Sequence, residues 1–64
     1  MASRQMTKSA LREAIAMEDA NIDAYSLILT VKKPSGGRRE EVLQGMIQSK
    51  ERRKILIEAL SKLE

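Results

Sequence analysis

Cysteine, histidine, phenylalanine and tryptophan are all missing from this 64-residue sequence, which has a single proline and a single tyrosine. The absence of Cys excludes disulfides and thiolate metal sites. The absence of His removes the commonest metal ligand and the usual general base near neutral pH. A chain this short buries only a modest fraction of its surface, so without a disulfide or a metal it usually needs a partner. Association with another chain is the remaining source of stability.

Long hydrophobic runs are also missing. The most apolar stretch, residues 24–31, is far below the ~20 residues needed to cross a bilayer. The first fifteen residues contain no continuous apolar segment of the kind found in a secretory signal. Together with the lack of Cys, which fits a reducing compartment, these features predict a cytoplasmic protein that does not associate with membranes.

One strong break interrupts the sequence, at residues 32–38. Pro34 cannot continue a helix, and Gly36 and Gly37 permit the positive φ angles of a tight reversal. Thr7 or Ser9 is a plausible N-cap for the preceding segment. We therefore predict a single domain over residues 1–64, with a helix at about 8–31, a basic loop at 32–38 and a helix at about 39–63.

Both predicted helices have an apolar face with the alternating spacing of three and four residues that is typical of a buried helix side. In the first helix the face is formed by Leu11, Ile15, Ile22, Tyr25 and Leu29. In the second helix it is formed by Val42, Leu43, Met46, Ile47, Leu56, Ile57, Leu60 and Leu63. Two helices joined by a short loop must lie antiparallel, and each stripe is wider than one neighbour can cover. We predict an all-α hairpin that dimerises into a four-helix bundle, with a higher oligomer as the alternative.

Charged side chains interrupt both apolar faces halfway along. Glu18 occupies a position of the first stripe, and Ser49, Lys50 and Arg53 interrupt the second. In an antiparallel hairpin the two midpoints face each other, and a buried carboxylate needs a cationic partner. We therefore predict a buried or half-buried ion cluster in which Glu18 pairs with Arg53 and Lys50 lies nearby. In the alternative, Glu18 lies at the edge of the stripe and its side chain extends into water.

The loop accounts for the net charge of +3, because residues 32–39 contain four basic residues and no acidic one. Lys32, Lys33, Arg38 and Arg39 flank a Ser-Gly-Gly turn that leads into a helix N-terminus, where an anion such as phosphate could bind. The alternative is that these cations only complement the helix ends and raise solubility. The Gly-Lys-Ser/Thr order of a phosphate-binding P-loop is absent.

Residues 15–25 (IAMEDANIDAY) resemble the first helix of a ferritin-like, rubrerythrin-type half-bundle. That helix carries a metal-ligating Glu, matched here by Glu18, with a Tyr seven residues later, matched by Tyr25. The resemblance implies that the second helix would carry a Glu-x-x-His motif, which falls on Lys50 and Arg53. An alternative register places Glu51 and Lys54 there instead. On the first register the resemblance implies a ferritin-like form without a metal site, in which cations replace the metal charge.

No constellation of catalytic side chains is apparent, because there is no His or Cys and no Ser lies beside a base. We predict that the protein is not an enzyme and uses no cofactor. The first hypothesis is a homo-oligomeric bundle with a structural or protein-interaction role. The alternatives are a small nucleic-acid- or phosphate-binding bundle that uses the basic loop, and a ferritin-like metal-binding module.

Overall fold

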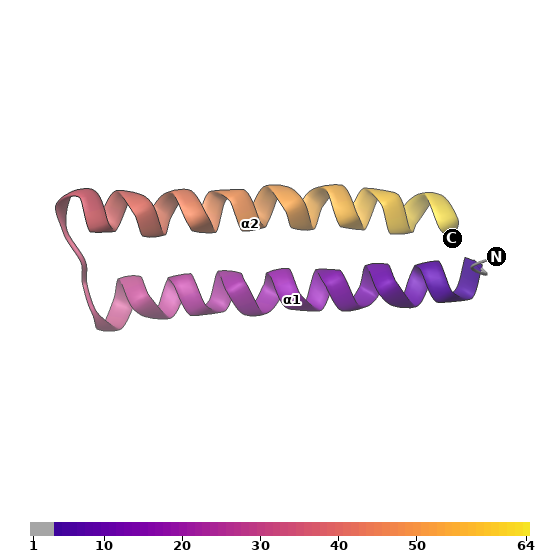
Figure 1. The fold of residues 1–64 in the computed structure, drawn as a ribbon, viewed down its shortest axis with the longest axis horizontal. Coiled ribbons are helices and arrows are strands. Elements are labelled where there is room, and N and C mark those ends of the chain that lie inside the picture. Colours follow the sequence, from indigo (N-terminus) through magenta and orange to yellow (C-terminus); the bar gives the residue numbers. More distant parts are fainter. Residues whose placement is uncertain (1–3) are drawn as a thin grey trace.

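Two antiparallel α-helices of equal length form the whole fold (Figure 1). The computed structural model describes the backbone of residues 4–64 and the side chains of residues 7–64. Helix α1 spans Arg4–Val31 and helix α2 spans Gly36–Leu63, 28 residues each. The rod measures 47 × 17 × 15 Å, close to the ~42 Å expected for 28 residues at 1.5 Å per residue. The predicted all-α antiparallel hairpin is confirmed.

The helix ends differ from the prediction by several residues. Helix α1 begins at Arg4 rather than at about residue 8, so Thr7 and Ser9 lie inside the helix instead of capping it. The residues before Thr7 include Arg, Gln and Met, which are strong helix formers and allow the helix to continue. Helix α2 begins at Gly36 rather than at about residue 39.

The loop is therefore shorter than predicted and consists of residues 32–35. Lys33 and Gly36 both adopt positive φ angles, of 46° and 59°, and this allows the chain to reverse within a few residues. Ser35 occupies the N-cap position of α2 with extended backbone, but its side chain makes no capping hydrogen bond. The loop lies at the opposite end of the rod from the start of α1 and the end of α2 (Figure 1).

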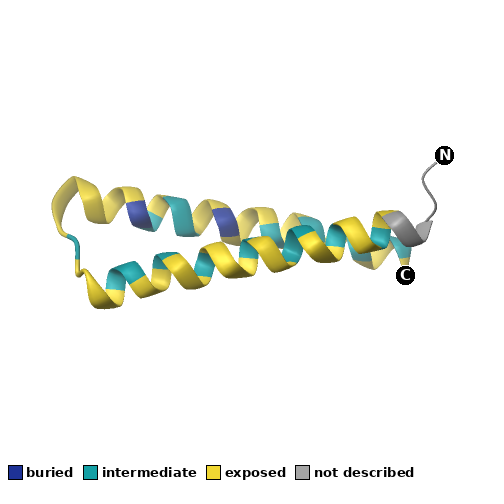
Figure 2. Ribbon diagram, turned by 60° about the horizontal axis from the view of Figure 1, so that its bottom comes forward, coloured by how far each residue is buried: buried dark blue, intermediate teal, exposed yellow. Residues whose placement is uncertain are grey.

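The two helices pack along most of their predicted faces but enclose almost no core (Figure 2), and Ile47 and Ile57 of the predicted second face are exposed. Half-buried residues follow the facing sides of both helices, whereas the outer sides are exposed. Among residues 7–64, Val42 is the only hydrophobic side chain that is buried, with 6% of its surface exposed. Six large hydrophobic side chains are between 38% and 65% exposed: Met17, Leu27, Val31, Ile47, Ile55 and Ile57. A single hairpin thus leaves much of its apolar surface in contact with water.

The only aromatic side chain packs against the backbone of the other helix. Tyr25 of α1 lies over Gly45 of α2, so closely that a Cβ atom at Gly45 would come within 2.7–2.9 Å of three Tyr25 atoms. Glycine in a helix interior costs about 1 kcal/mol relative to alanine, and here its missing side chain makes room for the ring. This contact fixes the register of the two helices.

Neither helix has a stretch apolar enough to span a membrane within the part of the chain that the structure describes.

Candidate functional site

The charged cluster at the centre of the rod is built around the Glu18 carboxylate. Glu18 continues the stripe by which α1 faces α2, and its side chain is only 13% exposed. Arg52 of α2 holds both carboxylate oxygens: its Nε donates to Oε2 at 2.8 Å and its Nη2 donates to Oε1 at 3.3 Å. Such a two-pronged contact matches the planar fork of the guanidinium to the carboxylate and fixes its orientation.

Two further side chains complete this cluster. The Asn21 Nδ2 atom donates to Glu18 Oε1 at 3.4 Å, one turn further along α1. The Arg52 Nη2 atom also donates to Ser49 Oγ at 3.1 Å, and Ser49 is fully buried. A buried hydroxyl needs a hydrogen-bonding partner, so the serine that interrupts the apolar stripe of α2 belongs to the polar cluster.

The protonation states follow from this geometry. The hydrogen bond from Arg52 is the main cause that lowers the pKa of Glu18 below its ordinary value of 4.5, with burial opposing it and Asn21 and Ser49 adding smaller hydrogen-bond contributions. The hydrogen bond to Glu18 in turn raises the pKa of Arg52. Both groups are therefore charged near neutral pH and neutralise each other. A carboxylate held in this state is poorly suited to general acid–base chemistry, which needs a pKa near the working pH.

A second ion pair lies beside the first. The Arg53 Nε atom donates to Asp19 Oδ1, one residue further along both helices than the Glu18–Arg52 pair. Arg53 and Asp19 are each roughly half exposed, so solvent screens their attraction and the pair contributes little to stability.

The predicted pairing of Glu18 with Arg53 is wrong, because Glu18 pairs with Arg52 and Arg53 with Asp19. Lys50 is exposed and has no ion pair among the side chains that the structure describes. Successive helix residues point about 100° apart, so the observed register turns Lys50 away from Glu18. Whether a second molecule buries this region stays a prediction.

Sequence reasoning missed Arg52 and Asp19, although a signal for them was present. Two adjacent acidic residues, Glu18 and Asp19, occupy the midpoint of one helix, and two adjacent arginines occupy the midpoint of the other. An antiparallel hairpin brings such doublets together. In both observed pairs the acidic and the basic residue are 34 positions apart in the sequence.

The four basic residues of the predicted anion site lie around the loop. Lys32, Lys33, Arg38 and Arg39 are all exposed. None of them forms an ion pair within residues 7–64. They remain available for an anionic partner, and whether they bind one stays a prediction.

The acidic side chains that the structure describes are dispersed along the two helices. No three acidic side chains among residues 7–64 gather closely enough to hold a metal ion. Glu18 is instead occupied by Arg52.

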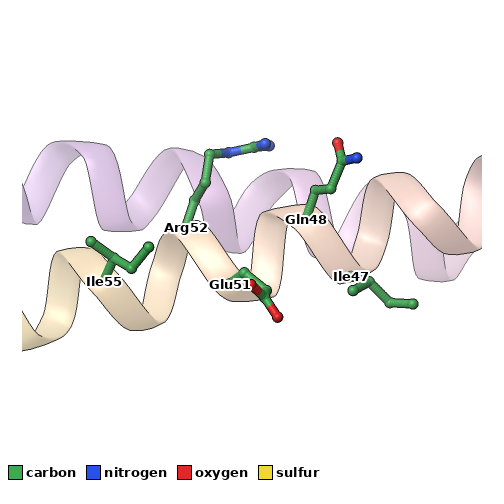
Figure 3. Close-up of a pocket in the computed structure, with 5 residues that line it drawn as sticks. All are labelled: Ile47, Gln48, Glu51, Arg52 and Ile55. Atoms are coloured by element: carbon green, nitrogen blue, oxygen red, sulfur yellow. The ribbon is translucent and has the colours of Figure 1, made fainter.

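Two shallow grooves lie on either side of Arg52 and Ile55. The first, of about 320 Å³, runs between the helices and is lined by Ala14, Glu18, Arg52, Ile55 and Leu56. The second, of about 450 Å³, lies on α2 alone and is lined by Ile47, Gln48, Glu51, Arg52 and Ile55 (Figure 3). Gln48 and Arg52 point to the same side of α2 in this view. Both grooves are open, so their apolar linings suit contact with a macromolecular surface better than enclosure of a small ligand.

No family model, curated protein or solved structure matches this chain. The resemblance to the ferritin-like half-bundle therefore stays a prediction, and the function has to be argued from the geometry.

Proposed function

We propose that this protein is a non-enzymatic helical hairpin that associates with itself, forming a homodimeric four-helix bundle with a structural or protein-interaction role. The observation that supports this most strongly is the exposed surface. The chain exposes 5001 Å², whereas a compact folded monomer of 7.2 kDa exposes about 4100 Å². The excess of about 900 Å² is close to the ~800 Å² that each partner buries in a standard protein–protein interface.

The composition of this surface supports the same proposal. Six large hydrophobic side chains are more than one third exposed, while one hydrophobic side chain is buried among residues 7–64. Complete burial of such a side chain contributes about 1.5–3 kcal/mol, so covering a half-exposed one contributes on the order of 1 kcal/mol. Several of them together match the few kcal/mol by which small domains are stable.

The central cluster also supports a role without catalysis. Glu18 and Arg52 neutralise each other, and the Ser49 hydroxyl oxygen accepts a hydrogen bond from Arg52. Neither a nucleophile nor a proton-transfer group is poised there for a substrate. The ferritin-like form without a metal is part of this proposal.

The test is the mass and the stability of the purified protein as a function of concentration. Size-exclusion chromatography coupled to light scattering should give twice the mass of one chain, or a higher multiple. The thermal midpoint followed by circular dichroism should rise with protein concentration, because association stabilises the folded state by mass action. A chain that has the mass of a monomer and a midpoint independent of concentration would refute the proposal.

A second candidate function is binding of a polyanion, such as nucleic acid, by the basic loop. It is favoured by the four exposed cations at one end of the rod. Lys32→Gln with Lys33→Gln should lower the salt concentration needed for elution from a heparin column more than Lys50→Gln with Lys54→Gln does. Both double variants remove two positive charges, so equal shifts would mean that only net charge matters.

A further inference from the structure

We propose that the second copy packs on one particular face of the hairpin, which we call the Met17 face. On α1 this face consists of Ala14, Met17, Asn21, Ala24, Ile28 and Val31. On α2 it includes Arg52 and Ile55. The inference rests on the proposed self-association and adds to it the surface through which the copies meet.

The residues of α1 on this face form a second stripe beside the one that contacts α2. They follow one another in steps of three and four residues, the spacing of a helix side that packs against a neighbour. Asn21 is the only polar residue among the six. Met17 and Val31 are 64% and 65% exposed in the single hairpin. Helix α1 therefore has one stripe that is covered by α2 and a second stripe that is largely exposed, with only Ala14 and Ile28 half-buried.

The two ion pairs show which sides of the helices belong together. Met17 and Asp19 lie about 100° to either side of Glu18 on α1. Arg53 contacts Asp19, so the Asp19 side of the hairpin carries exposed charges. The groove lined by both Ala14 and Ile55 places those two residues on the other side. The Met17 side of α1 and the Ile55 side of α2 thus form one continuous face.

The opposite face is less suited to close packing. It carries the half-exposed pair of Asp19 with Arg53 and the exposed Lys50. Burial of these charges would require their desolvation, which attraction within one pair only partly offsets. Ile57 is the large hydrophobic side chain nearest to the Asp19–Arg53 side, and it is the least exposed of the six exposed large hydrophobic side chains. Apolar exposure on α1 therefore favours the Met17 face, whose α2 side carries Arg52 and, in the groove beside Ile55, Glu51.

The shape of the Met17 face suits another helix pair. Ala14 and Ala24 keep α1 slim, so that a neighbouring helix can approach closely. Ile55 is 63% exposed and lines both grooves, the one between the helices and the one on α2, of which Figure 3 shows the latter. Such a projecting side chain beside open hollows is the arrangement from which knobs-into-holes packing is made.

The centre of the face tolerates burial. In the groove between the two helices the charged groups are Glu18 and Arg52, which already form a neutral pair with two hydrogen bonds. A partner that covers this pair removes no unpaired charge from water, and Arg52, still 51% exposed, retains N–H groups for a further acceptor. Asn21 lies beside the pair, and a single polar residue in an apolar stripe can fix the register of helices.

A second copy fits this face better than a different protein does. The surface area that the hairpin exposes in excess of a compact monomer is close to the area that one partner buries in a standard protein–protein interface. With so little core of its own, the hairpin needs a permanent partner, and another copy is available wherever the chain is made. Two copies related by a twofold axis place the Met17 face against itself, apolar stripe against apolar stripe.

The experiment compares Met17→Lys with Ala16→Lys in the full chain. Both positions are exposed in the single hairpin, they are adjacent in sequence, and both variants add one positive charge. Met17→Lys should reduce the mass by light scattering to that of one chain at concentrations where the unaltered protein is dimeric. Ala16→Lys should leave the mass unchanged. A dimeric Met17→Lys variant together with a monomeric Ala16→Lys variant, or two dimeric variants, would overturn the inference.

A labelling experiment gives an independent measurement that does not depend on a disruptive charge. Because the chain has no cysteine, Met17→Cys and Ala16→Cys each introduce a single thiol. The Met17→Cys thiol should react with a maleimide at least tenfold more slowly in concentrated than in dilute protein, whereas the Ala16→Cys thiol should react equally fast in both. Equal behaviour of the two thiols in a protein shown to be dimeric would overturn the face but not the self-association. A monomeric unaltered protein would refute both.

Discussion

At the scale of single residues, the Glu18 carboxylate makes the stability of the protein depend on pH. Its pKa is lowered below 4.5, first of all by the hydrogen bond from Arg52. A lowered folded-state pKa means that the ion pair stabilises the protein above pH 4.5 and that this contribution is lost as the pH falls through the folded-state pKa. We expect the thermal midpoint to be nearly constant from pH 7 to about pH 5 and to fall by several degrees at lower pH. Circular dichroism melts across this range measure it.

The matched control for this prediction is Glu18→Gln, which keeps the shape of the side chain but cannot carry the charge. Its thermal midpoint should be lower than that of the unaltered protein at pH 7. The two proteins should converge as the pH falls through the folded-state pKa of Glu18, because the carboxylate is then protonated and uncharged. Asp19→Asn, which removes the acid of the half-exposed pair, should have a much smaller effect at pH 7. Equal effects of the two substitutions would contradict the distinction between the pairs.

A second residue-scale prediction concerns the contact of Tyr25 with Gly45. Gly45→Ala should destabilise the protein by roughly 1 kcal/mol, because the new methyl group displaces the Tyr25 ring. In a Tyr25→Ala background the same substitution should stabilise by about 0.8–1.0 kcal/mol, the ordinary gain of alanine over glycine in a helix. Urea denaturation of the unaltered protein, the two single variants and the double variant yields the coupling free energy between Tyr25 and Gly45, expected to be about 2 kcal/mol. Additive effects would mean that the ring does not depend on Gly45.

At the scale of the elements, the chain reversal makes different demands on the two glycines with which α2 begins. Gly36 has a φ of +59°, whereas Gly37 does not have a positive φ. A Cβ atom added at either position would have no neighbouring atom within 4 Å, so neither substitution causes a steric clash. Gly36→Ala should therefore destabilise by about 1–2 kcal/mol through backbone strain alone. Gly37→Ala should be neutral or slightly stabilising, because alanine favours the first turn of α2. Chemical denaturation compares the pair, and equal effects would contradict the assigned loop conformation.

The elements were predictable from sequence because their signals are local. Pro34 and the two glycines mark the reversal, and the three–four spacing marks the facing sides. The pairing of Glu18 was not predictable in the same way. It depends on the register between the helices, and a difference of one residue turns a side chain by about 100°.

The register itself is consistent over two contacts. Tyr25 and Gly45 lie seven residues, or two turns, from Glu18 and Arg52 along their respective helices. A glycine inside a long helix, opposite the only aromatic residue, was the available signal for this alignment. The identity of Arg52 as the partner of Glu18 follows once that contact is placed.

At the scale of the whole molecule, the central ion pair reports whether a second copy covers it. Glu18→Leu alone should lower the thermal midpoint by several degrees, because it leaves Arg52 without its carboxylate. Glu18→Leu combined with Arg52→Leu should instead equal or exceed the unaltered protein, since apolar side chains often replace a covered ion pair without loss. If the pair faced water, the two leucines would gain nothing, and the double variant would melt no higher than Glu18→Leu alone. Thermal melts at several protein concentrations decide between these outcomes. We expect the thermal midpoint of the double variant to rise with protein concentration, because the hairpin completes its core with a second copy of itself.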